Sequence, residues 1–308
     1  MMNDNRGPIF IGGLAQSGKT PLRMILGSHP DVSMTRQTYM WRRFYGRFGD
    51  LSSGRNLDRC LSAMLRETGV LRLRPDLERI RREFLDGPST YAHLFALFHH
   101  HHAERLGKRR WGEQLTFAER FADPIFAAFP TARMIHMIRD PRARYVARKG
   151  THRRTIGKVG WETAMWLYSI ALAERNRRDY PNNYKVVMYE DLTMRPLETV
   201  HELCAFVGEE FVPSMERAVS ATKFGRGNGV NDTAGSVART NGRSPADVLF
   251  VNRYTRQQLR ALNYPVMNAS LSPLTQLSFQ LVDRPLNLAT MTAWRVLKGG
   301  SPAKRVGS

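Results

Sequence analysis

The chain has 308 residues, of which 47 are lysine or arginine and 27 are aspartate or glutamate, so its formal net charge is +20 at pH 7. A hydrophobic content of 42% with 10% aromatic residues indicates a globular core and excludes a disordered chain. The excess positive charge indicates an anionic partner: a nucleic acid, a membrane surface, or a phosphorylated or sulfated molecule.

Cysteine usage and the amino terminus bear on the compartment. Cys60 and Cys204 are the two cysteines, and they lie far apart in the sequence. Such a pair makes neither a disulfide framework nor a metal-ligand cluster, which favours a reducing compartment. The amino terminus lacks the apolar core of a signal peptide, and no apolar run approaches the length of a membrane span. We therefore expect a cytoplasmic protein.

A glycine-rich segment near the amino terminus carries the strongest motif. The apolar run 8–11 predicts a buried strand, and the periodic segment 22–26 predicts a helix capped by Thr20. Residues from Gly13 to Thr20 match the phosphate-loop pattern G-x-x-x-x-G-K-[ST]. Strand, loop and helix together direct backbone N–H groups and the positive helix end at an anion, although a plain strand-to-helix turn is the alternative. The residues expected to bind a phosphate-bearing ligand are Gln16, Ser17, Gly18, Lys19, Thr20 and Pro21.

The rest of the chain alternates predicted strands and helices. This alternation after a phosphate loop predicts an α/β fold, a P-loop-type three-layer sandwich with a central parallel sheet flanked by helices. Further strands are expected at 132–138 and 184–189, and helices at 56–65, 75–85, 91–106, 160–179, 196–207 and 247–262.

The end of the second predicted strand supplies a candidate anion ligand. In an open α/β sheet, ligands bind beyond the carboxyl ends of the strands. Arg139 lies at that point, with Arg142 and Arg144 after it, so we expect a guanidinium to bind a phosphate there. The alternative is a structural ion pair between Arg139 and Asp140.

A run of four histidines and a polar, glycine-rich stretch are two further candidate functional segments. The four histidines 99–102 lie in a predicted helix, where at most the first and last share a face, and no nearby carboxylate or cysteine completes a metal site, so we expect no metal. The polar, glycine-rich stretch 223–245 predicts a long loop. Its arginines, Arg226, Arg239 and Arg243, are candidates to close over an anion.

The carboxyl-terminal segment is expected to form an extension. We divide the chain into a P-loop domain at 1–265 and an extension at 266–308, which contains an amphipathic candidate helix at 286–298 with basic residues around it. Such a helix lies on a membrane surface, packs on its own domain, or packs on a second subunit, so membrane contact and a homodimer both stay open.

Several separated pieces, in this order, resemble the sulfotransferases that use 3′-phosphoadenosine 5′-phosphosulfate, particularly the bacterial and tyrosylprotein-type branch. The resemblance covers roughly residues 8 to 210, with a weaker similarity to about 265. The pieces are residues 9–13 with 17–20, His29 to Val32, Trp111 to Glu113, Phe129 to Arg142, Val187 to Leu192, and Leu203 to Gly208.

The resemblance implies a transferase that moves a sulfuryl group from this donor to a hydroxyl or amine and releases adenosine 3′,5′-bisphosphate. The acceptor is unidentified: a small molecule, a glycan or a lipid. The family works without a divalent metal. Arg139 stands where the family has its 3′-phosphate arginine, and Lys19 is expected to stabilise the sulfuryl and bridging oxygens.

Several positions depart from the family pattern. Gln16 stands where the family usually has a basic residue, and Lys19 stands where it usually has threonine. Ala147 replaces a serine that usually follows the phosphate arginine, and residues 114–116 replace a Lys-Thr-Pro triplet. Whether these changes abolish activity is an open question, and a catalytically inactive nucleotide-binding homologue is one alternative.

The general base is not defined by any spacing. In the tyrosylprotein-type branch it is a glutamate whose equivalent here falls near Gln37, which is not a base. Glu113 and His93 are weak candidates, with His29 and Asp50 behind them.

Two further classes compete with the sulfotransferase interpretation. A P-loop kinase or NTPase that uses ATP and magnesium fits the loop literally, but it needs a strand-terminal acid, for which Asp140 and Asp191 are poor candidates. A nucleic-acid binder is indicated by charge alone, and no basic motif interleaved with aromatic residues supports it. The ordered set of pieces favours the sulfotransferase, with no nucleic-acid partner.

Overall fold

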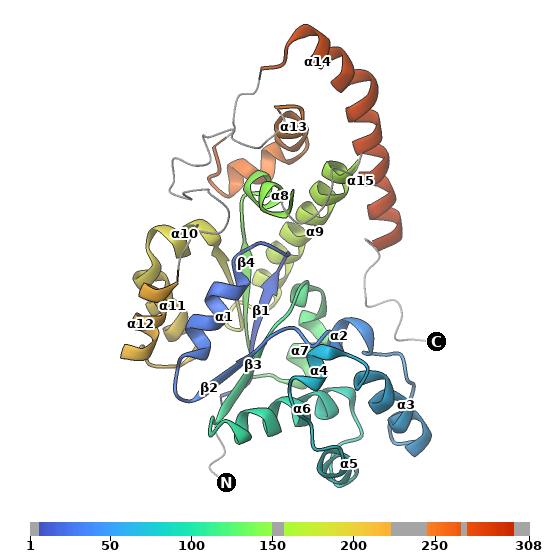
Figure 1. Ribbon diagram of the computed structural model, residues 1–308, viewed down its shortest axis with the longest axis vertical. Coiled ribbons are helices and arrows are strands. Elements are labelled where there is room, and N and C mark those ends of the chain that lie inside the picture. The colour runs from blue at the N-terminus through green and yellow to red at the C-terminus, as the bar shows by residue number, and fades with distance from the viewer. Residues whose placement is uncertain (1–5, 150–156, 223–244, 266–269, 299–308) are drawn as a thin grey trace.

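A five-stranded parallel sheet forms the centre of the molecule, with helices on both faces (Figure 1). The structure is a computed structural model that describes residues 6–149, 157–222, 245–265 and 270–298. The strand order is β2-β3-β1-β4-β5, so the chain crosses over between neighbouring strands, as in doubly wound folds. The strands are β1 Ile9–Gly13, β2 Val32–Thr35, β3 Arg110–Gln114, β4 Arg133–Ile138 and β5 Tyr184–Met188. The predicted α/β fold with a flanked parallel sheet is therefore confirmed.

Strands β2 and β3 were not evident as strands from the sequence. β3 carries Arg110 at one end and Glu113 near the other, yet both side chains are buried. The sheet tolerates them because each has polar partners: Arg110 forms an ion pair with Glu209 at 2.8 Å, and Glu113 accepts hydrogen bonds from Thr38.

One face of the sheet packs against the helices that follow β2 and β3. Phe10, Trp111, Met134 and Tyr184 project from β1, β3, β4 and β5 into this layer. The sheet side chains alternate between faces, because strand residues have a period of two. The helices here are α2 Met40–Arg43, α3 Gly54–Met64, α4 Thr68–Leu71, α5 Leu77–Leu85, α6 Tyr91–Arg105 and α7 Ala122–Ala128, with the short 3₁₀ helix η1 Ala118–Phe121 before α7.

The opposite face packs against the first helix and the helices after β5. Ile9 and Ile11 of β1, with Ile135 and Met137 of β4, project into this second layer. Gly208 ends α11 with a φ of +74°, the left-handed conformation that favours glycine at this position. The helices of this layer are α1 Lys19–Gly27, α10 Tyr189–Met194, α11 Pro196–Val207 and α12 Pro213–Ala221.

Helices beyond the carboxyl edge of the sheet complete the molecule, at the top of Figure 1. The last helix packs along α9: Trp294 is buried against Trp161 and Tyr168, and Asn287 accepts a hydrogen bond from the Gly160 backbone N–H at 3.0 Å. The division of the chain at residue 265 stays a prediction. The helices beyond the carboxyl edge of the sheet are α8 Pro141–Lys149, α9 Lys158–Asp179, α13 Pro245–Ala261, α14 Pro273–Ser278, the π-helical turn η2 Phe279–Asp283 and α15 Arg284–Lys298.

Among the described residues, no helix has the length and apolar character needed to cross a bilayer.

Candidate active site

The predicted phosphate loop connects β1 to α1. Gly13 ends the strand with a φ of +110°, and Gly18 precedes the helix with a φ of +91°. The helix begins at Lys19, so Gly18 rather than Thr20 occupies the cap position. The first backbone N–H groups of a helix have no partners within it, and here they lie at the carboxyl edge of the sheet, where an anion is bound in this class of fold.

Gly18 is required for two independent reasons. Its φ disfavours any other residue, and a Cβ atom at this position would lie 2.2 Å from Cδ2 of Tyr189. The Tyr189 ring, at the start of α10, therefore closes the loop from one side.

We expect Gly18→Ala to lower the unfolding free energy by several kcal/mol, since it adds a steric clash to an unfavourable φ. Gly46→Ala is the matched control, because Gly46 has a φ of +68° and a Cβ atom added there would meet no atom within 4 Å. It is expected to cost about 1 kcal/mol. Chemical denaturation of both variants measures the difference, and equal losses would show that the Tyr189 contact does not constrain the loop.

Lys19 lies beneath the loop. Its side chain is 4% exposed, and its Nζ donates hydrogen bonds to the carbonyl oxygen of Gly13, at 2.8 Å, and to that of Leu14. Thr20, the next residue, is exposed, and its Oγ1 lies 3.5 Å from Oε1 of Gln114 at the end of β3. The ammonium and the hydroxyl thus both lie where β1 and β3 end.

Arg139 lies beside the same loop. Its Nη1 donates a hydrogen bond to the carbonyl oxygen of Gln16 at 3.2 Å, and its guanidinium stacks over the Tyr189 ring at 4.2 Å from the centroid. Trp166 of α9 donates from Nε1 to the Arg139 carbonyl oxygen at 3.0 Å, which fixes the backbone at this point. The two stretches that the sequence singled out, the loop and the end of β4, are therefore in contact.

Arg142 and Arg144 have different partners from Arg139. Arg142 forms an ion pair with Asp140 at 2.6 Å, and Arg144 forms one with Glu162 at 2.6 Å. Both guanidinium groups are almost fully buried. Both therefore form structural ion pairs, and the partner of Asp140 is Arg142 rather than Arg139.

A chain of buried polar groups holds the loop from below. The carboxylate of Glu119 accepts hydrogen bonds from the Gly13 backbone N–H at 2.9 Å and from Ser169 Oγ at 2.8 Å. His136 is within hydrogen-bond distance of Ser169 Oγ, at 3.0 Å, and of the Tyr184 hydroxyl, at 2.6 Å. Burial lowers the pKa of His136. No motif marks these residues, so the sequence did not identify them.

Glu113 is the candidate base at the same edge of the sheet. Its side chain is fully buried. Oε1 accepts two hydrogen bonds from Thr38, one from the backbone N–H and one, at 2.6 Å, from Oγ1. Oε2 has no hydrogen-bond partner and lies 3.6 Å from His99 Nε2. Burial raises the pKa of Glu113 to about 8 and lowers that of His99 to about 3, so the imidazole is neutral.

The other candidate bases lie elsewhere. His29 follows the carboxyl end of α1, about 13 Å along the helix from the loop, and accepts a hydrogen bond from the Asp31 backbone N–H. His93 stacks on Phe84 of α5, and Asp50 is exposed between α2 and α3. Glu113 is linked to the loop through its neighbour Gln114, whose Oε1 lies 3.5 Å from Thr20 Oγ1.

The remaining sequence predictions concern three arginines of the stretch 223–245 and the run of four histidines. Arg226, Arg239 and Arg243 lie outside the described residues. Among the residues that the structure describes, no group of three or more histidine, cysteine, aspartate or glutamate side chains is arranged to hold a metal ion. His99 of the four-histidine run stacks on Trp111 and packs in the core.

The parallel sheet, with a glycine loop after β1 and an arginine beside that loop, defines a P-loop-type α/β protein. Residues 8–213 match the model of a family described as the sulfotransferase family. The chain belongs to this family. A comparison with curated protein sequences gave no match.

Solved structures share the fold at low sequence identity. The sulfotransferase domain of the Synechococcus PCC 7002 olefin synthase is 18% identical, with a TM-score of 0.50, and the alignment covers 91% of this chain and 96% of that one. Mouse sulfotransferase SULT7A1, crystallised with PAP, is 13% identical with a TM-score of 0.50, and the alignment covers 84% and 85% of the two chains.

Proposed function

We propose that this protein is a sulfotransferase that uses 3′-phosphoadenosine 5′-phosphosulfate as donor and a hydroxyl or amine as acceptor. The observation that carries the proposal is the hydrogen bond from Arg139 to the loop carbonyl of Gln16. It places a guanidinium beside an amide-rich turn, which fits a nucleotide with a charged group at each end. The crystallisation of the mouse relative with PAP supports the same donor.

Each residue has a proposed role in transfer. The loop N–H groups, Lys19 and Thr20 bind the 5′ end and stabilise negative charge on the sulfuryl and bridging oxygens, and Arg139 binds the 3′-phosphate. The donor supplies a sulfuryl group with a good leaving group. Transfer breaks the bond from sulfur to the bridging oxygen and forms one to the acceptor atom, whose proton passes to a base.

We propose Glu113 as that base, because its Oε2 has no hydrogen-bond partner and its pKa of about 8 suits proton abstraction. A base must be ionised, so turnover should rise with pH up to about 8. We expect Glu113→Gln to lower kcat by about 100-fold or more and to remove this pH dependence, with adenosine 3′,5′-bisphosphate binding unchanged. His93→Gln is the matched control and should retain the wild-type profile.

The stability of the wild type and of Glu113→Gln as a function of pH tests the raised pKa, and their activities separate a catalytic role of Glu113 from a structural one. Because burial raises the pKa of Glu113 above its ordinary value of 4.5, its stabilising contribution is complete below pH 4.5 and is lost as pH rises to about 8. Glu113→Gln should lack this loss. If Glu113 only positions Thr38, glutamine will retain most of the activity, and the assignment as base is wrong.

The structure favours this proposal over a magnesium-dependent NTPase. The carboxylate of Asp140 accepts from both Nε and Nη2 of Arg142, and Asp191 lies on the surface beside Arg195. Neither acid is placed to hold a magnesium ion next to the loop.

Donor turnover with an acceptor panel tests the function. Radiolabelled donor is incubated with the protein and with phenolic, glycan and lipid acceptors, and label transfer is measured. Transfer to any class supports the proposal and assigns the acceptor. Magnesium-dependent ATP hydrolysis, with no binding of adenosine 3′,5′-bisphosphate, would contradict it. Tight binding of this nucleotide without any transfer would identify an inactive homologue.

A further inference from the structure

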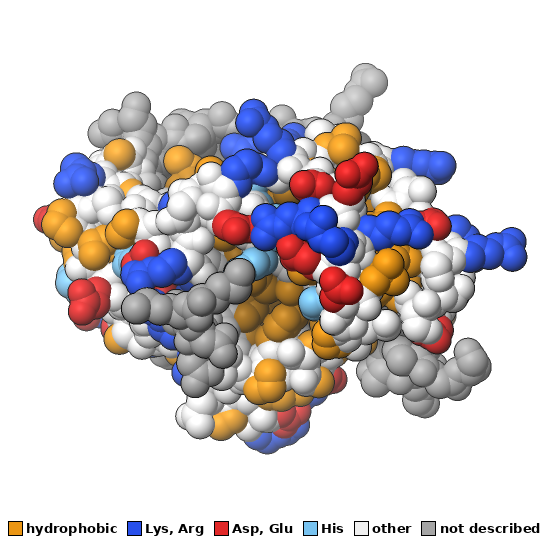
Figure 2. Space-filling model, turned by 90° about the horizontal axis from the view of Figure 1, so that it is seen from below, with side chains coloured by type: hydrophobic (Ala, Val, Ile, Leu, Met, Phe, Trp, Pro, Cys, Tyr) orange, Lys and Arg blue, Asp and Glu red, His pale blue; other side chains and the backbone are white. Residues whose placement is uncertain are grey.

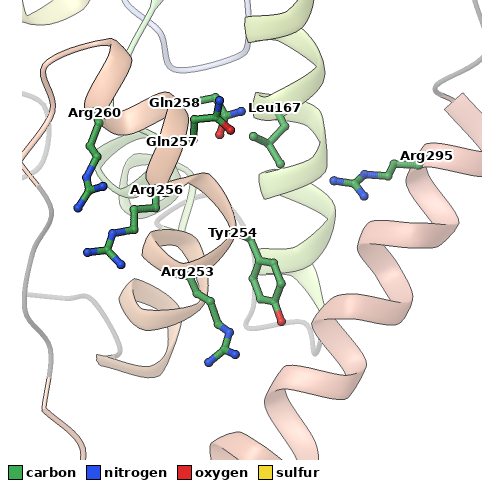
Figure 3. Close-up of a pocket in the computed structure, with 8 residues that line it drawn as sticks. All are labelled: Leu167, Arg253, Tyr254, Arg256, Gln257, Gln258, Arg260 and Arg295. Atoms are coloured by element: carbon green, nitrogen blue, oxygen red, sulfur yellow. The ribbon is translucent and has the colours of Figure 1, made fainter.

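A groove lies beyond the carboxyl edge of the sheet, where α9, α13 and α15 meet. Its volume is about 630 Å³, and its lining includes Arg253, Arg256 and Arg260 of α13, Arg295 of α15, and Leu167 of α9. Figure 3 shows these side chains and shows Arg295 extending from α15 toward Leu167. The spacing of the three α13 arginines, at i, i+3 and i+7, places them along one side of that helix. We call this set the arginine groove.

The arginine groove differs from the charged surface elsewhere. Within the described part of the chain, none of its four arginines forms an ion pair. At the α5 end of the molecule, basic and acidic side chains lie next to one another (Figure 2), and Arg79 and Arg81 of α5 pair with Glu83 and Asp58. The positive charge of the arginine groove is therefore not balanced by neighbouring described acids, which makes it a surface for an anion.

Large apolar side chains are exposed on the helices next to this groove. Residues 273–298 contain one acid, Asp283, and span α14, η2 and α15. Leu274 is 82% exposed and Val296 is 77% exposed. The exposed apolar side chains of this segment, which we call the apolar face, are Leu274, Leu277, Leu281, Val282, Leu286, Val296 and Leu297. Isolated exposed leucines are ordinary, but a concentration of this kind marks an interaction surface.

The apolar face and the arginine groove are parts of one structural unit. Along α15, Trp294 is buried on α9, Arg295 lines the groove, and Val296 belongs to the apolar face. At the start of α15, Arg284 donates a hydrogen bond to the hydroxyl of Tyr254, which also lines the groove, at 3.1 Å. Cations thus flank a helix that presents leucine and valine outward, the arrangement of helices that lie in a membrane interface.

We propose that the arginine groove and the apolar face together dock this protein on the surface of an anionic lipid bilayer. The arginines contact lipid phosphates, and the apolar side chains enter the boundary between headgroups and acyl chains. The inference does not depend on the proposed reaction. A nucleic acid or a soluble sulfated sugar complements the arginines but leaves the apolar face exposed. An isologous dimer through this surface would bring two sets of like charges together.

Vesicle co-sedimentation tests the proposal with the full chain. The vesicles consist of phosphatidylcholine alone or of phosphatidylcholine with 30% phosphatidylglycerol, a composition chosen to give roughly the surface charge that attracts basic segments. The first variant replaces Arg253, Arg256 and Arg260 by glutamine. The second is Leu277→Ser with Leu281→Ser. The control replaces Arg55, Arg59 and Arg217, exposed arginines on α3 and α12, by glutamine and so has the same net charge as the first variant.

We expect the wild type to bind the anionic vesicles and not the neutral ones. Each arginine near an anionic surface contributes roughly fivefold in affinity, so the groove variant should bind about 100-fold more weakly, and the control should stay close to wild type. The serine variant should lose the binding that persists at high salt. All variants replace exposed side chains, so circular dichroism should show unchanged folding. Equal losses in groove variant and control, no vesicle binding by the wild type, or a dimer that the serine variant abolishes would each overturn the proposal.

Discussion

Lys19→Ala is expected to weaken the binding of adenosine 3′,5′-bisphosphate by at least tenfold and to lower kcat by about 1,000-fold. The ammonium is buried and bonded to two loop carbonyls, so its loss removes both the charged contact that we propose to the ligand and the bonds that hold the loop. The larger effect falls on kcat, since charge develops on the bridging oxygen during transfer. Calorimetry gives the affinity, and steady-state turnover of the donor gives kcat.

Lys185→Ala controls for the loss of one positive charge. Lys185 lies on the surface of β5, where it pairs with Glu202 at 3.3 Å, and its removal should change neither quantity more than twofold. A Lys19→Ala protein with wild-type affinity and turnover would place the reaction away from the loop.

Arg139→Ala and Arg142→Ala are expected to fail in different ways. Arg139 is half-buried beside the loop, so its loss should weaken nucleotide binding by at least tenfold with little change in stability. Arg142 neutralises buried Asp140, so its loss should lower the unfolding free energy by about 3–5 kcal/mol, because an unpaired charge stays in the interior. Thermal unfolding and calorimetric titration of both variants provide the two readouts.

The contrast between the two variants tests which arginine binds the anion. The assigned roles are exchanged if Arg142→Ala keeps wild-type stability but binds the nucleotide more weakly. They are also exchanged if Arg139→Ala is strongly destabilised and yet, at a low temperature where it stays folded, binds the nucleotide with wild-type affinity.

The sequence predicted the part of the fold that local patterns encode. β1, β4 and β5 are largely apolar runs, and Gly13 and Gly18 of the loop both have a positive φ, as Gln16 between them also does, so strand, loop and helix could be placed. β3 could not be placed, because its Arg110 and Glu113 are buried only through partners far away in sequence, and no local pattern shows those partners.

The candidate site divides in the same way. The sequence does not distinguish Arg139 from Arg142 and Arg144. Only the tertiary structure shows that Arg142 and Arg144 pair with Asp140 and Glu162, whereas Arg139 lies beside the loop. No sequence motif marks Glu119, yet its carboxylate accepts a hydrogen bond from the Gly13 backbone N–H. Tyr189 lies in a segment that the family resemblance includes, but its contacts with Gly18 and Arg139 follow from the tertiary fold.

The central claim is that the loop and Arg139 hold the two ends of one nucleotide, and a calorimetric cycle tests it most directly. Adenosine 3′,5′-bisphosphate and adenosine 5′-monophosphate, which lacks the 3′-phosphate, are each titrated into the wild type and into Arg139→Ala. We predict that loss of the 3′-phosphate weakens binding to the wild type at least tenfold and changes binding to Arg139→Ala by less than twofold. An equal loss in both proteins would show that Arg139 does not contact the 3′-phosphate and would contradict the account.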